Sequence, residues 1–341
     1  MRIDYNKLTA DVTDALTAHG LDDEQAKILA SSFVAATAAG VATHGVSMLG
    51  AYLKKLTLGQ FNTAPDFKFI KKTGSFAVID SDNAIGAVSA KYCMDFAVSS
   101  AKEQGIYTVF SRNCNTYGPA FYYSKIASDN GLIGITFCNT PSAMAPWNSK
   151  TKALGTNPFA VAIPGAKNGP IMLDIATSKV AKSKINKARL AGESIPSDWA
   201  LDTDGNPTTD PLEAIKGTVL PMAEYKGYGI AMAIDIIAGV LSGAGYLNGV
   251  NRFYSDGEDG MNVGQVFVAI DPRIVLSDSF YSDIDGYINQ IHACEPLGDD
   301  AVLYPGERKN KNLADSLKNG VELTAEEYET IMRLKDEKVI V

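Results

Sequence analysis

Cysteine and histidine are both scarce in this sequence of 341 residues. The cysteines stand far apart in the chain, without a C-x-x-C pair or a neighbouring histidine pair, so the sequence predicts neither a zinc site nor a disulfide framework. No metal site is predicted. Imidazole chemistry would have to use one of three side chains, which are His19, His44 and His292. The four cysteines are Cys93, Cys114, Cys138 and Cys294.

The sequence also has no long hydrophobic run and no excess of positive charge. Its longest apolar run, residues 230–241, is interrupted by Asp235 and is too short to cross a bilayer, so we expect a buried helix there. The N-terminus lacks the apolar segment of a secretory signal. A net charge of −8 disfavours binding to nucleic acid or to an anionic membrane. These features predict a cytoplasmic protein without nucleic-acid or membrane partners.

What the sequence does contain is an alternation of strand and helix patterns. Three β-type runs, at residues 133–138, 159–163 and 171–176, are separated by Pro, Gly and Asn, which predicts adjacent strands of one buried sheet. We expect further strands at 67–70, 76–79, 106–110 and 266–270, and helices at 22–39, 84–104, 276–294 and 323–335. The pattern predicts an α/β protein with two lobes. Residues 131–275 would form a sheet domain, and residues 1–130 and 276–341 a helical lobe.

Two positions in this pattern could bind an anion. A helical pattern begins at Thr177 and Ser178, and free backbone N–H groups at a helix start favour phosphate. Lys226 stands before the apolar helix, where a cation opposes the helix dipole unless an anion lies between them. A solvated lysine explains Lys226 equally well. The Rossmann pattern G-x-G-x-x-G is not present, because Gly227-Tyr228-Gly229 lacks the third glycine.

Two further segments are candidates for a site. His44 lies at a helix start between Gly40 and Gly45, although a lone histidine is more often structural than catalytic. A polar loop, residues 113–118, is expected between a strand and a helix, where α/β folds often build sites. An Asn-rich turn without further role is an equally good interpretation.

Six segments, taken together, resemble the malate/L-lactate dehydrogenase family of type 2. This family includes ureidoglycolate and sulfolactate dehydrogenases, diketogulonate reductase and cyclic ketimine reductases. The resemblance runs in order over nearly the whole chain. It is carried by THGVSMLGAYLKKLTLG, NCNTYGPAFYYSKIA, LGTNPFAVAIP, LDIATS, YKGYGIAMAIDIIAGVLSGA and YPGE.

The resemblance implies an NAD(P)-dependent oxidoreductase with a non-Rossmann cofactor fold, commonly a homodimer. It identifies His44, within Thr43-His44-Gly45, as the proton donor and acceptor. Cofactor contacts fall on Thr140, Asp174, Ile175, Ala176, Thr177, Ser178, Lys226, Gly306 and Glu307. Positions expected to line the substrate pocket are Thr43, Met48, Tyr52, Asn115, Thr116 and Asn139.

Two departures from the family pattern concern the substrate. Many members carry arginine, which holds a substrate carboxylate, where this chain has Met48, and some carry a second histidine where it has Thr116. Loss of such a carboxylate clamp removes a contact of about 1.5–3 kcal/mol. The acid group must be held elsewhere, or the substrate lacks one.

The expected reaction is hydride transfer between nicotinamide and a small 2-hydroxy or 2-oxo compound. Reduction of a cyclic C=N bond and NAD(P) binding without catalysis are alternatives. The choice between NAD and NADP stays open, although Lys182, Lys184 and Lys187 could meet a 2′-phosphate.

Overall fold

The computed structural model describes residues 1–254 and 260–337, and a mixed seven-stranded sheet lies at its centre. The strand order is β2-β3-β4-β10-β5-β6-β7, with β3 and β4 parallel and the other neighbours antiparallel. The prediction of a mixed α/β fold is therefore confirmed. The strands are β2 (Lys68–Lys72), β3 (Phe76–Asp80), β4 (Ile106–Cys114), β5 (Ile133–Cys138), β6 (Phe159–Ile163), β7 (Ile171–Ile175) and β10 (Val263–Ile270).

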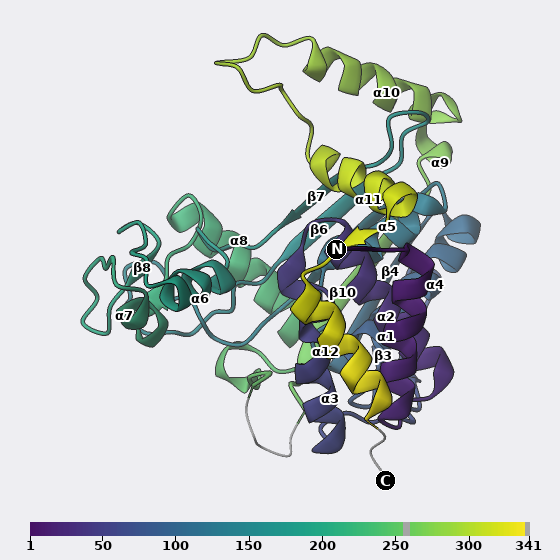
Figure 1. Cartoon of the computed structure of the whole chain (residues 1–341). Coiled ribbons are helices and arrows are strands. Elements are labelled where there is room, and N and C mark those ends of the chain that lie inside the picture. The colour runs from purple at the N-terminus through teal and green to yellow at the C-terminus, as the bar shows by residue number, and fades with distance from the viewer. Residues whose placement is uncertain (255–259, 338–341) are drawn as a thin grey trace.

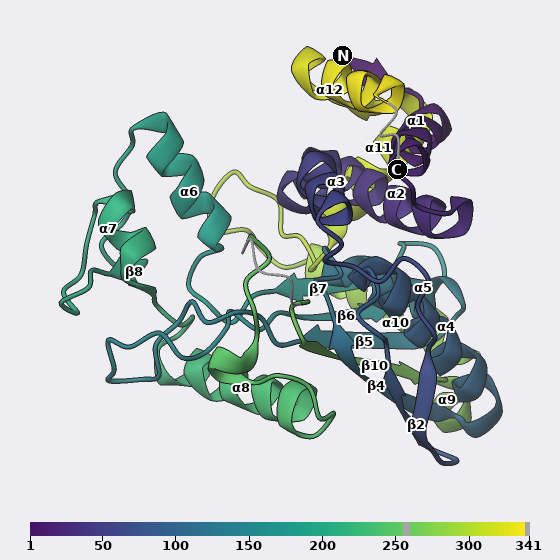
Figure 2. The ribbon, with the colours of Figure 1, turned by 90° about the horizontal axis from the view of Figure 1, so that it is seen from below.

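Helices α4 (Gly86–Gln104) and α5 (Ala120–Asp129) pack on one face of this sheet. Alanines on the buried side of α4 let the helix lie close to the strands. The other face carries α8 (Tyr225–Asp235), which continues into the π-helical turn η3 (Ile236–Val240). Figure 2 shows α8 on the side of the sheet opposite to α1, α2 and α3.

The prediction of a buried helix at 230–241 is wrong in one respect. The helix forms, but only one side of it packs on the sheet, so Ile236, Val240 and Leu241 are 48%, 52% and 63% exposed. No helix among the described residues is long and apolar enough to cross a membrane.

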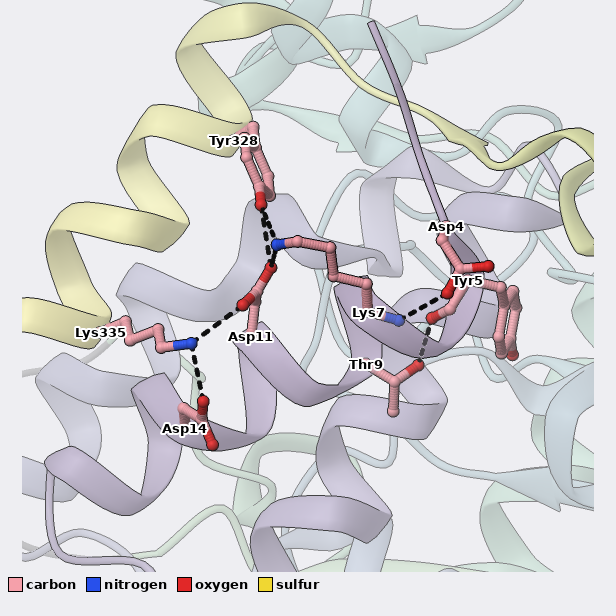
Figure 3. Close-up of polar contacts among 8 residues, drawn as sticks. All are labelled: Asp4, Tyr5, Lys7, Thr9, Asp11, Asp14, Tyr328 and Lys335. Atoms are coloured by element: carbon pink, nitrogen blue, oxygen red, sulfur yellow. Dashed lines mark hydrogen bonds and ion pairs between the residues drawn. The ribbon is translucent and has the colours of Figure 1, made fainter.

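Both ends of the chain meet in one group of helices. These are α1 (Tyr5–Ala18), α2 (Asp23–Ala38), α3 (Leu49–Thr57), α11 (Glu307–Asn319) and α12 (Ala325–Asp336). Strand β1 (Arg2–Ile3) pairs with β11 (Val321–Glu322). Figure 3 shows Lys7, Tyr328 and Lys335 converging on Asp11, which joins α1 to α12 at distances of 2.6, 2.9 and 2.9 Å.

Two excursions leave the sheet. One, to the left of the sheet in Figure 1, has its own small core and contains α6 (Lys182–Ala191), β8 (Ala200–Leu201), α7 (Pro211–Lys216) and β9 (Thr218–Val219). The other contains α9 (Arg273–Leu276) and α10 (Ser279–His292), with Ser277 at φ +56° between them. The helix expected at 276–294 forms as α10, and the short helix α9 precedes it.

The structure corrects two further boundaries. Strands β2, β3 and β4 belong to the central sheet although they lie within the segment 1–130 that we assigned to the helical lobe. Strand β4 extends to Cys114, so Asn113 and Cys114 lie in a strand rather than in the expected polar loop, because β10 pairs with β4 as far as Cys114.

Candidate active site

His44 lies in a short 3-10 turn, η1 (Ala42–His44), which is followed by a second turn, η2 (Val46–Met48). Its backbone N–H donates to the Val41 carbonyl at 3.1 Å, and the Val46 N–H donates to Thr37 Oγ1 on α2 at 3.0 Å. Gly45 is required here, since a Cβ would lie 2.2 Å from Thr37 Oγ1. The backbone is thus fixed to α2, while the His44 residue stays exposed.

The surroundings of His44 favour a neutral imidazole. Enclosure by the protein lowers the pKa of His44 below its ordinary value of about 6.5, and the Asp174 carboxylate opposes this effect in part. At neutral pH the ring can therefore accept a proton.

Asp174 lies at the end of β7, on the sheet face that α5 covers. The register places it in one row with Phe267, Thr136 and Ala160 on neighbouring strands. The small Ala160 leaves room beside the carboxylate. Lys309 of α11 donates to Asp174 Oδ2 at 3.3 Å, so α11 is joined to the end of β7 at this point.

The segment after β7 differs from the prediction. Helix α6 begins at Lys182, not at Thr177, and the Thr177 N–H and Oγ1 both donate to the Thr156 carbonyl, at 2.9 and 2.8 Å. The expected free N–H group at Thr177 is therefore already paired, and Thr177 is fully buried. The backbone after β7 is extended, because it pairs with residues 221–222 before α6 begins.

That pairing brings Lys226 close to the end of β7. Ser178 forms a bridge with Pro221, and the Met222 N–H donates to the Thr177 carbonyl at 2.9 Å. Helix α8 begins a few residues later, with Lys226 in its first turn. Within residues 1–254 and 260–337, the exposed Lys226 ammonium has no ion-pair partner, which leaves it available to an anion.

Thr140 follows β5 and is held by Asn157. The Thr140 N–H donates to Asn157 Oδ1 at 3.0 Å, while Asn157 Nδ2 donates to the Ala231 carbonyl on α8 at 2.9 Å. This fully buried amide ties the end of β5 to α8. Asn157 lies within the motif LGTNPFAVAIP but was not among the predicted site residues.

Gly306 and Glu307 lie beside the first half of β7. The Met172 N–H donates to the Pro305 carbonyl at 2.8 Å, and a Cβ on Gly306 would lie 2.7 Å from the Met172 Cβ. Burial alone would raise the pKa of Glu307, but hydrogen bonds from Lys311, His292 and the Tyr304 N–H outweigh burial and lower it. The Glu307 carboxylate therefore stabilises the start of α11.

Three of the residues expected to line the substrate pocket use their polar groups within the protein. Tyr52 donates to the Thr116 carbonyl at 3.2 Å, and Asn139 joins Gly245 to Gly264 at 2.7 and 2.9 Å. Asn115 donates to Asn83 and Ala84 and accepts from the Met261 N–H. All three are almost fully buried, so these polar groups hold the surrounding backbone in place.

Met48 and Thr116 contact a segment that sequence reasoning missed. The Tyr254 hydroxyl lies 3.7 Å from Met48 Sδ, and the Thr116 N–H lies 3.4 Å from Met261 Sδ. A phenol group thus lies beside Met48, and a thioether lies beside the backbone of Thr116. The aromatic pair Phe253-Tyr254, which stands within a polar stretch of the sequence, could have marked this segment as a candidate.

Of the predicted cofactor positions, Thr140 follows β5, residues 174–178 lie at and after the end of β7, and Lys226 lies at the start of α8, whereas Gly306 and Glu307 lie beside the first half of β7. Thr43 is exposed beside His44, and Ile175 and Ala176 continue from Asp174. A cavity of about 440 Å³ lies apart, in the excursion, and its lining includes Trp147, Lys150 and Asp204 but none of the predicted site residues. Among the described residues, no cluster of His, Cys, Asp and Glu could hold a metal ion.

Comparison with known proteins identifies the family of the chain. A family model described as malate/L-lactate dehydrogenase matches residues 3–332. A solved structure of sulfolactate dehydrogenase from Methanocaldococcus jannaschii is 36% identical, with a TM-score of 0.89 over 98% of this chain and 96% of that one.

Two curated relatives carry cofactors in their names. The ureidoglycolate dehydrogenase (NAD(+)) of Escherichia coli O157:H7 is 32% identical over 334 residues, 97% of this chain and 95% of that protein. The (2R)-3-sulfolactate dehydrogenase (NADP(+)) of Chromohalobacter salexigens is 32% identical over 298 residues, 87% of each chain.

The mixed α/β fold and these matches over nearly the whole chain define the class as an NAD(P)-dependent dehydrogenase of the α/β type. The chain belongs to the malate/L-lactate dehydrogenase family. The family predicted from the motifs is thus confirmed.

Proposed function

We propose that this protein catalyses reversible hydride transfer between NAD or NADP and a small 2-hydroxy or 2-oxo acid or a related carbonyl compound. The observation that carries the proposal is the exposed imidazole of His44, on which the Asp174 carboxylate at the end of β7 acts. The relatives named as NAD(+)- and NADP(+)-dependent dehydrogenases support the choice of cofactor.

His44 moves the proton in this proposal. During oxidation, neutral His44 takes the proton of the substrate hydroxyl while a hydride leaves the carbon that bears this hydroxyl. During reduction, the carbonyl carbon receives the hydride and the imidazolium returns the proton to the carbonyl oxygen. The lowered pKa of His44 keeps the base form abundant at neutral pH. The nicotinamide cofactor, when bound, supplies or accepts the hydride.

Residues at the ends of β5 and β7 would hold the cofactor. The fit rests on Lys226, a cation without an ion-pair partner in the described part of the chain, which follows the Thr177-Met222 pairing. Such a cation suits a pyrophosphate or phosphate group. Strands of alternating direction, with one parallel pair, support cofactor binding by a fold other than the Rossmann type.

The residues around Met48 favour a substrate whose nearby substituent carries no negative charge. Thioether, methyl and phenol groups of Met48, Thr116 and Tyr254 provide contacts to a neutral or apolar substituent. We therefore expect the substrate either to be uncharged at this point or to place its acid group elsewhere.

A substrate panel tests the proposal directly. Purified protein is incubated with NADH or NADPH and with 2-oxo acids, their amides, diketo sugar acids and cyclic imines, while absorbance of the reduced cofactor is followed. Oxidation of the cofactor by a carbonyl compound supports the proposal. Turnover of cyclic imines alone would assign the C=N reaction, and cofactor binding without any turnover would assign a non-catalytic protein.

We also infer that two copies associate through the second face of the sheet. In an antiparallel sheet with one face in water, that face is normally polar. Here Val268, Ile135, Val161 and Leu173 form one apolar row that stays half-exposed. The exposed apolar side of α8 and η3 lies on the same face.

A second copy fits this surface better than a charged partner. In α8 and η3 the only charged residues are Lys226 and Asp235, and Asp235 is buried, so the chain's net charge of −8 is not concentrated there. Two such faces can meet around a two-fold axis without like-charge repulsion. A homodimer is therefore the expected assembly.

A further inference from the structure

Lys309 holds an unusual position for a lysine. Its side chain is 21% exposed, its Nζ lies 3.3 Å from Asp174 Oδ2, and it also lies 5.1 Å from the centre of the Phe121 ring. Asp174 is 16% exposed. A pair this enclosed keeps much more of its electrostatic effect than a surface pair does.

This pair is connected to the turn that carries His44. Phe121, beneath Lys309, belongs to a small buried cluster with Ala39 and Met172, and Val41 and Leu313 pack against it. Val41 in turn accepts the backbone hydrogen bond of His44. One packed unit therefore joins β7, α11 and the His44 turn.

The charged groups around His44 are few. The neighbouring side chains on its own turn and on α2, including Thr43, Ser47 and Thr37, are neutral. Burial raises the pKa of Tyr117 well above its ordinary range and that of Cys138 to about 12, so both stay uncharged beside Asp174. The charged group that acts on the His44 imidazole is the Asp174 carboxylate on β7, and the ion-pair partner of Asp174 is Lys309 on α11.

From this geometry we infer that Lys309 is a positioning residue: it holds the Asp174 carboxylate and offsets its charge, so that His44 is kept available as a base. The inference rests on the proposed function. Asp174 raises the pKa of His44, and a cation bound to Asp174 acts in the opposite direction. Without Lys309, Asp174 would stabilise the imidazolium and could turn toward it.

The three histidines of the chain make this testable by NMR. Imidazole signals are titrated with pH in the wild type and in Lys309→Met, which keeps the aliphatic stem over Phe121 and removes the charge. His19→Gln and His292→Gln assign the signals. The pKa of His44 is expected to rise by roughly 0.5–1 in Lys309→Met and to stay near the wild-type value in Lys309→Arg.

A matched control and an opposite change complete the experiment. Lys125 pairs with Asp129 on α5 at 2.6 Å and is 29% exposed, so Lys125→Met removes a comparable lysine away from the site and should leave the His44 titration unchanged. Asp174→Asn should lower the pKa of His44, in the opposite direction to Lys309→Met.

The outcomes separate the inference from the proposed function. An unchanged His44 titration in folded Lys309→Met, or an equal change in Lys125→Met, would overturn the role of Lys309 even in an active enzyme. If the titration moves as expected while no substrate is turned over, the role of Lys309 stands and the dehydrogenase proposal fails. In an active enzyme, the acid limb of kcat/KM for oxidation should move upward in Lys309→Met by the same amount as the NMR titration.

Discussion

The His44 turn has a fixed backbone and an accessible side chain. Thr37, Gly45 and Val41 fix the backbone through hydrogen bonds and close packing, yet none of them covers the ring. Fixing the backbone lowers the cost of presenting the imidazole in one orientation to a substrate. Such a side chain can be replaced with little effect on folding and a large effect on the reaction.

His44→Ala should therefore lower turnover about 10²–10⁴-fold, the usual contribution of a general acid or base. Cofactor affinity should change little, because the expected cofactor residues lie on the strand ends and α8. Steady-state kinetics and titration of NAD(P)H fluorescence measure the two quantities separately. The matched control is His19→Ala, since the His19 ring bonds to the Ala15 carbonyl of its own helix at 2.8 Å. Equal turnover in wild type and His44→Ala would remove His44 from the mechanism.

Some residues of the candidate site could be predicted from the sequence, and others could not. His44, Asp174 and Lys226 could be singled out because motif and helix position mark them. Lys309 could not, since a lysine in the charged helix after YPGE reads as a solvated residue until Asp174 is seen beside it. The same holds for Asn115 and Asn139: the sequence marks them as polar, but only the fold reveals that their amides are already bonded.

At the scale of elements, periodicity predicted β5 and β6 to the residue, because turn residues bound them on both sides. It misplaced the helix after β7, where hydroxyl residues that could begin a helix instead pair with Thr156 and with the segment before α8. Long-range pairing of this kind leaves no local signal. The same reason explains why β2 to β4 were assigned to the wrong part of the molecule.

The junction of β7 and α11 depends on one glycine. Gly306 has φ +91°, and a Cβ would lie within 2.8 Å of three Met172 atoms. Gly306→Ala should cost about 1–3 kcal/mol in backbone strain, with a similar cost from overpacking. The control is Gly192→Ala at the end of α6, where φ is +69° but no atom lies within 4 Å, so only strain applies. Equal losses in chemical denaturation would contradict the close packing of Gly306 on β7.

The two ends of the chain are joined by the Asp11 cluster of Figure 3. Burial alone would raise the pKa of Asp11, but hydrogen bonds from Lys7, Lys335 and Tyr328 outweigh burial and lower it. A carboxylate with a lowered folded pKa stabilises the fold above its unfolded pKa of about 3.9, and this contribution is lost as pH falls through the folded value.

Asp11→Asn should therefore lower the free energy of unfolding at pH 7 by about 1–3 kcal/mol. The difference from wild type should shrink as pH falls below about 4. Urea denaturation at a series of pH values measures both effects. Asp95→Asn breaks an exposed pair with Lys91 and should change stability by less than about 1 kcal/mol. A constant difference at all pH values would exclude the charge of Asp11 as the cause.

Over the whole molecule, the two faces of the sheet differ in how far other elements cover them. One is closed by α4 and α5, with the terminal helices beyond them, and carries Asp174 toward His44. The other is apolar and half-open, so covering it would remove several large side chains from water at about 25 cal/mol per Å². The difference explains why a buried helix was expected at 230–241: the sequence records the apolar character of the helix but not what covers it.

The open face predicts a dimer that a change of charge should dissociate. Ile236→Asp with Val240→Asp places two carboxylates on η3, at positions 48% and 52% exposed, where they cost the folded monomer little. In the two-fold assembly the same carboxylates would be buried without partners, which is strongly unfavourable. Light scattering after gel filtration should give twice the chain mass for wild type and one chain mass for the variant. Leu190→Asp on α6, where Leu190 is 71% exposed, should leave the dimer intact. A monomeric wild type, or a variant that stays dimeric, would show that a second copy does not cover this face.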